Sequence, residues 1–133
     1  MVIDTSALLA ILFDEPEADD IAVALDDDPV RLISAGSLLE TAIVVEARLG
    51  EAGGRELDLL VHKARIETVA VTPEQAEVAR SAWRRFGRGR HDASLNFGDC
   101  FAYALAATTG EPLLFKGTDF GKTDVQRVAL GRD

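Results

Sequence analysis

The chain has 133 residues, of which 47% are hydrophobic, and it carries a formal net charge of −9. This length fits one domain, residues 1–133, with enough apolar side chains to bury a core. No apolar run is long enough to cross a membrane, and the acidic balance argues against a protein that binds nucleic acid through net charge alone. The single cysteine excludes an internal disulfide, and because no signal peptide is evident we expect a cytoplasmic protein.

Short apolar runs alternate with helical patterns along the chain. The first run, Val2 to Asp4, predicts a buried strand that leads into a helix from Ala7 to Phe13, capped by Thr5 or Ser6. Further strands are expected at 30–34, 67–71 and 112–115, with a candidate edge strand at 127–130. Further helices are expected at 17–25, 36–49, 55–65, 72–86 and 97–108.

Glycine, proline and hydroxyl residues set the predicted helix ends. Ser37 is the expected N-cap of the helix that ends before Gly50, and Gly53-Gly54 is expected to form a turn before the next helix. Thr72 followed by Pro73 is a strong helix start.

This alternation predicts an α/β domain whose central parallel sheet is sandwiched by helices. We expect the strand order 3-2-1-4-5, in which strands one and four are neighbours. The ligand crevice of such a sheet lies beyond the carboxyl ends of its strands, at the point where the order reverses. Asp4 ends the first strand and Asp119 follows the fourth, so both are expected to line this crevice.

Two further acids lie in apolar surroundings. Glu40 is followed at helical spacing by Ile43, Val44 and Ala47, which places it on or near the buried stripe of its helix. Asp99 lies near the start of a helix that is otherwise apolar, so it enters the interior from a helix end. Each of the four acids also has a purely structural explanation, as a helix cap, a capping box, a first-turn acid or a turn residue.

Four acids in one crevice require a counter-charge. Two like charges about 4 Å apart repel by on the order of 4 kcal/mol at an effective dielectric constant of 20. No Lys or Arg adjoins Asp4, Glu40 or Asp99 in the sequence, whereas Lys116 lies near Asp119. An all-oxygen cluster without His or Cys suits Mg²⁺ or Mn²⁺, and such ions activate water and bind phosphate oxygens.

Four segments, in this order along the chain, resemble the PIN-domain ribonucleases, and among them the VapC toxins of bacterial type II toxin–antitoxin pairs. These segments are Val2-Ile3-Asp4-Thr5-Ser6-Ala7, Leu39-Glu40-Thr41, Leu95-Asn96-Phe97-Gly98-Asp99-Cys100 and Leu113-Leu114-Phe115-Lys116-Gly117-Thr118-Asp119-Phe120. The resemblance implies a single PIN-like domain and a Mg²⁺- or Mn²⁺-dependent endoribonuclease that hydrolyses RNA phosphodiester bonds, leaving a 5′-phosphate and a 3′-hydroxyl.

Carried over by position, the resemblance assigns the catalytic and metal-binding acids to Asp4, Glu40, Asp99 and Asp119. Asp124 lies close enough in the sequence to be an alternative to Asp119. Thr5 and Asn96 match polar positions beside the site.

The resemblance also implies partners. These are a second copy of the chain, a VapB-type antitoxin whose C-terminal tail covers the acidic groove, a higher-order toxin–antitoxin complex, and an RNA substrate such as tRNA or rRNA. Five arginines with no acid among them form what we call the arginine stripe: Arg80, Arg84, Arg85, Arg88 and Arg90.

The arginine stripe is our candidate contact for the RNA backbone, with a solvated helix end or contact with a Glu-rich antitoxin as alternatives. Trp83 and Phe86 alternate with these arginines, and either core or dimer packing or base stacking would explain them.

Other classes of protein fit this sequence less well. A phosphatase of the haloacid-dehalogenase type needs a second Asp two positions after Asp4, where this chain has Ser6. A receiver-type signalling domain needs paired acids in its first strand–helix region and a lysine late in the chain. Lys116 could be that lysine, but this sequence lacks the paired acids. A catalytically inert PIN-like scaffold that acts only by binding a partner is the remaining alternative, and the presence of all four acids argues against it.

Overall fold

The structure is a computed structural model, and it describes residues 1–131. Four short strands form one parallel sheet in the order β3-β2-β1-β4. They are β1 (Val2–Ile3), β2 (Leu32–Ser34), β3 (Glu67–Val69) and β4 (Leu113–Leu114). The predicted parallel sheet is confirmed, and so is the order of its first four strands.

The predicted fifth strand at 127–130 is wrong for the described residues. This segment makes only an isolated parallel bridge between Leu113 and Arg127, supported by a hydrogen bond of 2.9 Å from the Val128 amide to the Leu113 carbonyl. Because β4 is itself only two residues long, it offers too few free backbone groups to pair a longer neighbour.

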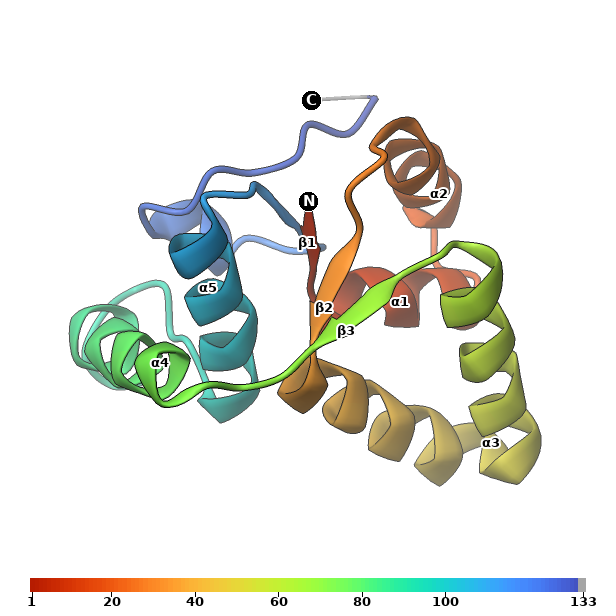
Figure 1. The fold of residues 1–133 in the computed structure, drawn as a ribbon, viewed down its shortest axis with the longest axis horizontal. Helices are drawn as coiled ribbons and strands as arrows, with labels where there is room; N and C mark the ends of the chain where they lie inside the picture. The colour runs from red at the N-terminus through yellow and green to blue at the C-terminus, as the bar shows by residue number, and fades with distance from the viewer. Residues whose placement is uncertain (132–133) are drawn as a thin grey trace.

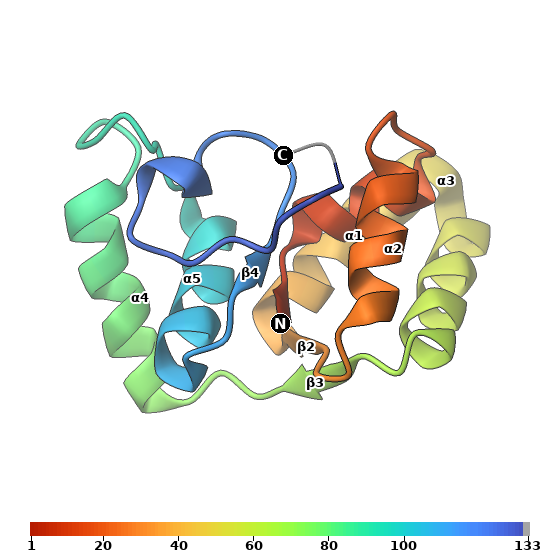
Figure 2. The ribbon, with the colours of Figure 1, turned by 90° about the horizontal axis from the view of Figure 1, so that it is seen from above.

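Helices cover both faces of the sheet. Figures 1 and 2 show α1, α2 and α3 on one side of the strands and α4 and α5 on the other. Within residues 1–131, no helix is both long and apolar enough to cross a membrane. The helices are α1 (Thr5–Leu12), α2 (Ala18–Asp27), α3 (Ala35–Lys63), α4 (Pro73–Phe86) and α5 (Phe97–Thr109), with a 3-10 turn, η1 (Phe120–Lys122).

The long helix α3 covers two predicted helices, and the predicted break after the first of them, at Gly50, is confirmed. Its kink lies at Gly50, which has φ 68° and ψ −164°, and the predicted turn at Gly53-Gly54 is instead buried helix. A Cβ atom on Gly53 would lie 2.8 Å from Cγ1 of Val45, so this glycine allows close packing across the kink. The predicted N-cap is also wrong: Ser34 caps α3, whereas Ser37 lies buried inside it.

The alternation of side chains along the strands divides the core in two. Val2 and Leu113 point toward the cluster packed under α4 and α5, whereas Ile3 and Leu114 point toward the cluster under α1, α2 and α3. Phe86 belongs to the first cluster, which confirms core packing for that residue. Strands β1 and β4 and most of β2 are buried, whereas β3 at the edge is largely exposed, so the carboxyl ends of β1, β2 and β4 form a rigid floor for the residues that follow them.

The N-cap of α4 provides a test of local stability. The Thr72 hydroxyl accepts a hydrogen bond of 3.1 Å from the Gln75 amide, as the sequence predicted for this helix start. We expect Thr72→Ala to lower the free energy of unfolding by about 1 kcal/mol, measured by urea denaturation. Glu77→Ala on the same helix is the control and should change it by less than about 0.5 kcal/mol. Equal values for both variants would contradict the capping role.

Candidate active site

The acids predicted from the sequence come together at the carboxyl end of β1. The charges of Asp99 and Glu40 both raise the pKa of Asp4, and the charges of Glu40 and Asp119 raise the pKa of Asp99. These charges contribute less than burial, which is the main reason why both pKa values are raised. Asp4, Glu40 and Asp99 therefore lie within electrostatic reach of one another, and Asp119 lies within reach of Asp99, although the four come from distant parts of the chain.

Asp4 uses its two carboxylate oxygens differently. It is the N-cap of α1, where Thr5 or Ser6 was predicted, and its Oδ2 accepts hydrogen bonds from the Ser6 amide at 3.0 Å and the Ser6 hydroxyl at 2.6 Å. Its Oδ1 is buried with no hydrogen-bond partner among the described residues. Burial raises the pKa of Asp4 to about 7, against the opposing effect of the Ser6 hydrogen bonds. The capping role thus leaves one carboxylate oxygen available for a ligand.

Glu40 is held between α1 and α5. Its Oε1 accepts a hydrogen bond of 2.7 Å from the Thr5 hydroxyl, and Thr5 is itself buried. Its Oε2 lies against the backbone of Gly98, where a Cβ atom would come within 1.9 Å of it. Only a glycine at position 98 therefore leaves room for this carboxylate at the start of α5.

Asp99 and Asn96 form a capping box at the start of α5. The Asn96 side chain accepts from the Asp99 amide at 2.9 Å, and Oδ2 of Asp99 accepts from the Asn96 amide at 3.0 Å. Asp99 is half-buried, so burial raises its pKa before the charges of its neighbours add to the effect. As with Asp4, the cap orients the carboxylate and uses one of its two oxygens.

Asp119, rather than Asp124, contributes to the raised pKa of Asp99. Asp119 is exposed just before η1, and its charge contributes to the raised pKa of Asp99. Asp124 accepts a hydrogen bond from the Tyr103 hydroxyl at 2.6 Å and pairs with Arg85 at 3.0 Å, and these contacts lower its pKa. Asp124 therefore belongs to a separate network.

Lys116 does not neutralise the acids. Its ammonium group pairs with Glu15 and, at 3.5 Å, with Glu17, and the hydrogen bond to Glu15 is the main reason for its raised pKa. Its backbone amide instead donates to the Ser6 hydroxyl at 2.9 Å, which links the end of β4 to the Asp4 carboxylate through Ser6.

The donor set suits a hard divalent cation. Its groups are carboxylates only, and a buried oxygen without a partner, such as Oδ1 of Asp4, is costly until a proton or a cation satisfies it. Within residues 1–131, however, no three acidic, histidine or cysteine side chains stand in positions that would already hold a metal ion. Ser6, Thr5 and Asn96 each donate a hydrogen bond that holds one oxygen of a carboxylate, in Asp4, Glu40 and Asp99 respectively.

The arginine stripe does not act as one unit. Arg85 is paired with Asp124, and the Arg90 guanidinium lies 4.3 Å from the centre of the Trp83 ring. Arg80 lines a cavity between α4 and α5, and Arg84 and Arg88 are exposed. Three of the five arginines are therefore engaged in contacts or line a cavity.

Two positioning residues escaped the sequence analysis. Ser6 was considered as a helix cap, and Gly98 was quoted without a role, yet Ser6 holds the carboxylate of Asp4 and Gly98 leaves room for that of Glu40. A serine two residues after an N-cap acid, and a glycine in the first turn of a buried helix, are the signals that could have indicated them.

Comparison with known proteins places this arrangement in a family. The sequence matches the PIN domain family over residues 1–126. It is 62% identical over 128 residues to Ribonuclease VapC from Mycolicibacterium smegmatis, covering 96% of this chain and 99% of the relative. It is 58% identical over 130 residues to Ribonuclease VapC30 from Mycobacterium tuberculosis, covering 98% of this chain and 99% of the relative.

Solved structures agree on the fold. The crystal structure of VapC20 from Mycobacterium tuberculosis, described as a sarcin–ricin loop cleaving toxin, matches with a TM-score of 0.75 at 21% identity, over 96% of this chain and 97% of that one. VapBC2 from Rickettsia felis, bound to a DNA fragment from its promoter, matches with a TM-score of 0.74 at 12% identity, over 96% of both chains.

The chain belongs to the PIN domain family. Within that family, its relatives of high identity are VapC ribonucleases, which confirms the resemblance drawn from the four sequence segments.

Proposed function

We propose that this protein is the toxic component of a type II toxin–antitoxin pair and a Mg²⁺- or Mn²⁺-dependent endoribonuclease. The observation that carries the proposal is the buried, unpartnered Oδ1 of Asp4, within reach of the charges of Glu40 and Asp99. The high identity to proteins named VapC ribonucleases, over nearly the whole chain, supports the same reaction class.

Each acid has a distinct part in this proposal. Asp4, Glu40, Asp99 and Asp119 would hold the cation, which when bound supplies the positive charge that activates water and stabilises negative charge on the phosphodiester. Ser6, Thr5 and Asn96 orient the first three carboxylates before the ion arrives. Because the pKa of Asp4 is about 7, a proton competes with the cation for this carboxylate at neutral pH.

The proposal includes the partners of the protein. A VapB-type antitoxin would inhibit it by covering the acidic groove, and homodimers would assemble with that antitoxin into a larger complex in the cytoplasm. The support comes from relatives, since the matching Rickettsia felis structure is a VapBC complex. The substrate would be a structured RNA such as tRNA or rRNA, in keeping with the description of VapC20 as a sarcin–ricin loop cleaving toxin.

Metal removal is the direct test. We expect the purified protein to cut total RNA into discrete fragments with Mg²⁺ or Mn²⁺, to stop in EDTA, and to resume when excess Mn²⁺ is added back. Fragments with a 5′-phosphate and a 3′-hydroxyl are expected. Cleavage that continues in EDTA would contradict the metal-dependent mechanism. The inert scaffold would instead bind antitoxin yet leave total RNA, tRNA and rRNA uncut under all metal conditions.

Ser6 should control metal affinity without touching the metal. Its hydroxyl donates to Oδ2 of Asp4 and accepts from the Lys116 amide, so Ser6→Ala frees the carboxylate to rotate. Loss of such an orienting partner typically weakens metal binding about 10- to 100-fold. We expect this weakening in Mn²⁺ titrations followed by calorimetry, and recovery in Ser6→Thr, which keeps the hydroxyl. Equal affinity in Ser6→Ala and the unmodified protein would refute the role.

A further inference from the structure

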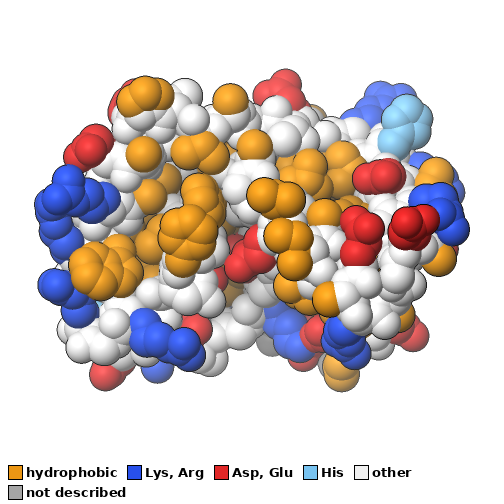
Figure 3. Space-filling model, turned by 90° about the horizontal axis from the view of Figure 1, so that it is seen from below, with side chains coloured by type: hydrophobic (Ala, Val, Ile, Leu, Met, Phe, Trp, Pro, Cys, Tyr) orange, Lys and Arg blue, Asp and Glu red, His pale blue; other side chains and the backbone are white. Residues whose placement is uncertain are grey.

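Asp119 differs from the other three acids in the way it is held. Asp4, Glu40 and Asp99 are each oriented by a hydrogen bond from a neighbouring residue. Asp119 is exposed, and within residues 1–131 its side chain makes no capping hydrogen bond at the start of η1. Figure 3 shows acidic side chains in the middle of one face of the molecule, with most of the basic ones toward its edges, which leaves the middle of this face acidic. The position of Asp119 therefore depends on the loop that carries it.

The loop that carries Asp119, residues 115–126, leaves the sheet and returns to it at the same place. It closes on Leu113, whose amide donates a hydrogen bond of 2.8 Å to the Gln126 carbonyl. Phe120, directly after Asp119, is buried in the core cluster under α4 and α5. These contacts fix the ends of the loop and one side chain in its middle, so the remaining question is what holds the stretch that returns from Phe120 to the sheet.

Asp124 fastens this returning stretch to the helices. Its Oδ1 accepts a hydrogen bond of 2.6 Å from the Tyr103 hydroxyl, and its Oδ2 pairs with Arg85 at 3.0 Å. Tyr103 is buried on α5, and burial is the main reason why its pKa is raised to about 12, so its hydroxyl remains a donor throughout the neutral range. A hydrogen bond from a buried donor to a charged acceptor is among the stronger ones, whereas the pair with Arg85 is about half exposed and contributes less. The contact with Tyr103 is therefore the firm part of this anchor.

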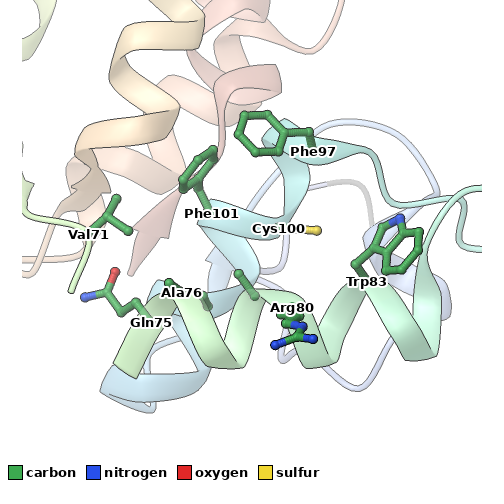
Figure 4. A pocket seen from close by; sticks show the side chains of 10 residues that line it. Val71, Gln75, Ala76, Arg80, Trp83, Phe97, Cys100 and Phe101 are labelled. Atoms are coloured by element: carbon green, nitrogen blue, oxygen red, sulfur yellow. The ribbon is translucent and has the colours of Figure 1, made fainter. Parts of the chain in front are cut away.

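Helix α5 sets the acid group and this anchor in register. Asp99 and Tyr103 are four residues apart on α5, so their side chains lie on the same face of the helix, one turn from each other. The α5 residues that line its cavity with α4, such as Phe101, lie on a different face (Figure 4). One face of a rigid helix thus carries an acid of the site and, one turn further on, the residue that holds Asp124. The loop fastened there carries Asp119, whose charge contributes to the raised pKa of Asp99.

From this geometry we infer that Tyr103 and Asp124 are positioning residues, which fix the loop so that Asp119 is held beside Asp99 in the acid group. Asp124 does not itself join the acids, because Tyr103 and Arg85 engage both of its carboxylate oxygens. Loss of the Tyr103 hydroxyl releases the loop without removing any acid. This inference rests on the proposed metal-dependent function and deepens it, since it names the residues that hold the fourth acid in place.

A double-mutant cycle on the full-length protein, read by Mn²⁺ titrations in a calorimeter, tests the inference. Tyr103→Phe keeps the ring and removes only the hydroxyl, and we expect it to weaken Mn²⁺ binding about 10-fold, the lower end of the range for loss of an orienting group. Asp119→Asn alone should weaken binding at least as much. In the Asp119→Asn background, Tyr103→Phe should change the affinity by less than about 2-fold, because the residue that it positions is already gone. Asp124→Ala should behave as Tyr103→Phe does in both backgrounds.

A second measurement, made without metal, separates release of the loop from a general loss of stability. Hydrogen exchange in residues 119–124 should become faster in Tyr103→Phe, because the turn η1 lies within this segment and loses its anchor. Thr72→Ala, which removes the N-cap of α4, is the matched control. It should lower the stability of the protein but change neither the Mn²⁺ affinity nor the exchange of this segment relative to the rest of the chain.

Several results would overturn the inference. An equal loss of affinity for Tyr103→Phe with and without Asp119 would mean that the contact supports the fold or the other acids instead. A further loss for Asp124→Ala in the Asp119→Asn background, without one for Tyr103→Phe, would make Asp124 itself a metal ligand. Unchanged affinity in Tyr103→Phe would refute the positioning role and leave the proposed function intact, whereas an unmodified protein that binds no Mn²⁺ would refute the proposed function and this inference with it.

Discussion

Asp4→Asn should abolish RNA cleavage and, in the same molecule, stabilise the metal-free protein at alkaline pH. We expect cleavage to fall by on the order of 10³-fold or more, equivalent to about 4 kcal/mol of transition-state stabilisation, because the variant removes a carboxylate from the centre of the acid group. The fold should persist, since an asparagine side chain can still accept the Ser6 hydrogen bonds that cap α1.

The effect on stability follows from the pKa of this carboxyl. Its value is about 7 in the folded protein against an ordinary 3.8, so between these values the folded state binds more protons than the unfolded state. Stability contributed by Asp4 therefore falls as the pH rises from 3.8 to 7, by on the order of 4 kcal/mol in total. Asparagine does not titrate, so the variant avoids this loss. Its unpartnered buried amide costs about 2 kcal/mol, which leaves a net gain in the free energy of unfolding on the order of 2 kcal/mol at pH 8.

Urea unfolding in EDTA at pH 5 and pH 8 measures this gain. Asp124→Asn is a control in which the change in stability has the opposite sign. Contacts with Tyr103 and Arg85 lower the pKa of Asp124, so the stability that this carboxylate contributes is present above its ordinary pKa. That variant should lose stability at pH 8. Mn²⁺ should stabilise the unmodified protein at pH 8 and not the Asp4→Asn variant. A pH dependence that is the same with and without Asp4 would contradict the buried, metal-free carboxyl described here.

Gly98→Ala should cost on the order of 10²-fold in cleavage although it adds only a methyl group. The new Cβ atom would overlap the position of Oε2 of Glu40, 1.9 Å away, so the carboxylate has to move. Its other oxygen is held by the Thr5 hydroxyl, which opposes a simple shift. A displacement of about 1 Å in a catalytic group can lower the rate by this factor.

Stability separates this effect from misfolding. Alanine is a better helix former than glycine, so the free energy of unfolding should stay within about 1 kcal/mol of the starting value. Gly121→Ala is the matched control, because a Cβ atom there has no described atom within 4 Å and its backbone is not in the left-handed region. Full cleavage activity in Gly98→Ala would show that Glu40 is not required in its observed position.

Local patterns determined much of this structure. Apolar runs that end in turn residues predicted the strands, and cap residues such as Thr72 predicted where helices begin. Acids in apolar segments predicted the candidate site, because an isolated buried carboxylate is too costly to be incidental. The predicted turn at Gly53-Gly54, which is instead buried helix, shows the limit of such patterns. A glycine pair can mark a turn or a close approach, and only the packing of Gly53 against Val45 decides between them.

Tertiary structure decided how each acid is held. Pairing of β1 with β4 brings the Lys116 amide to Ser6, and Ser6 then selects which oxygen of Asp4 remains free. Asp124 is engaged by a contact with Tyr103 from α5, far away in the sequence. The acid group, the Gly98 cradle and the cavity beside Asp99 all depend on contacts between distant segments. The sequence by itself determined which residues carry charge and where the chain turns, whereas the distances between them exist only once the sheet and its helices pack.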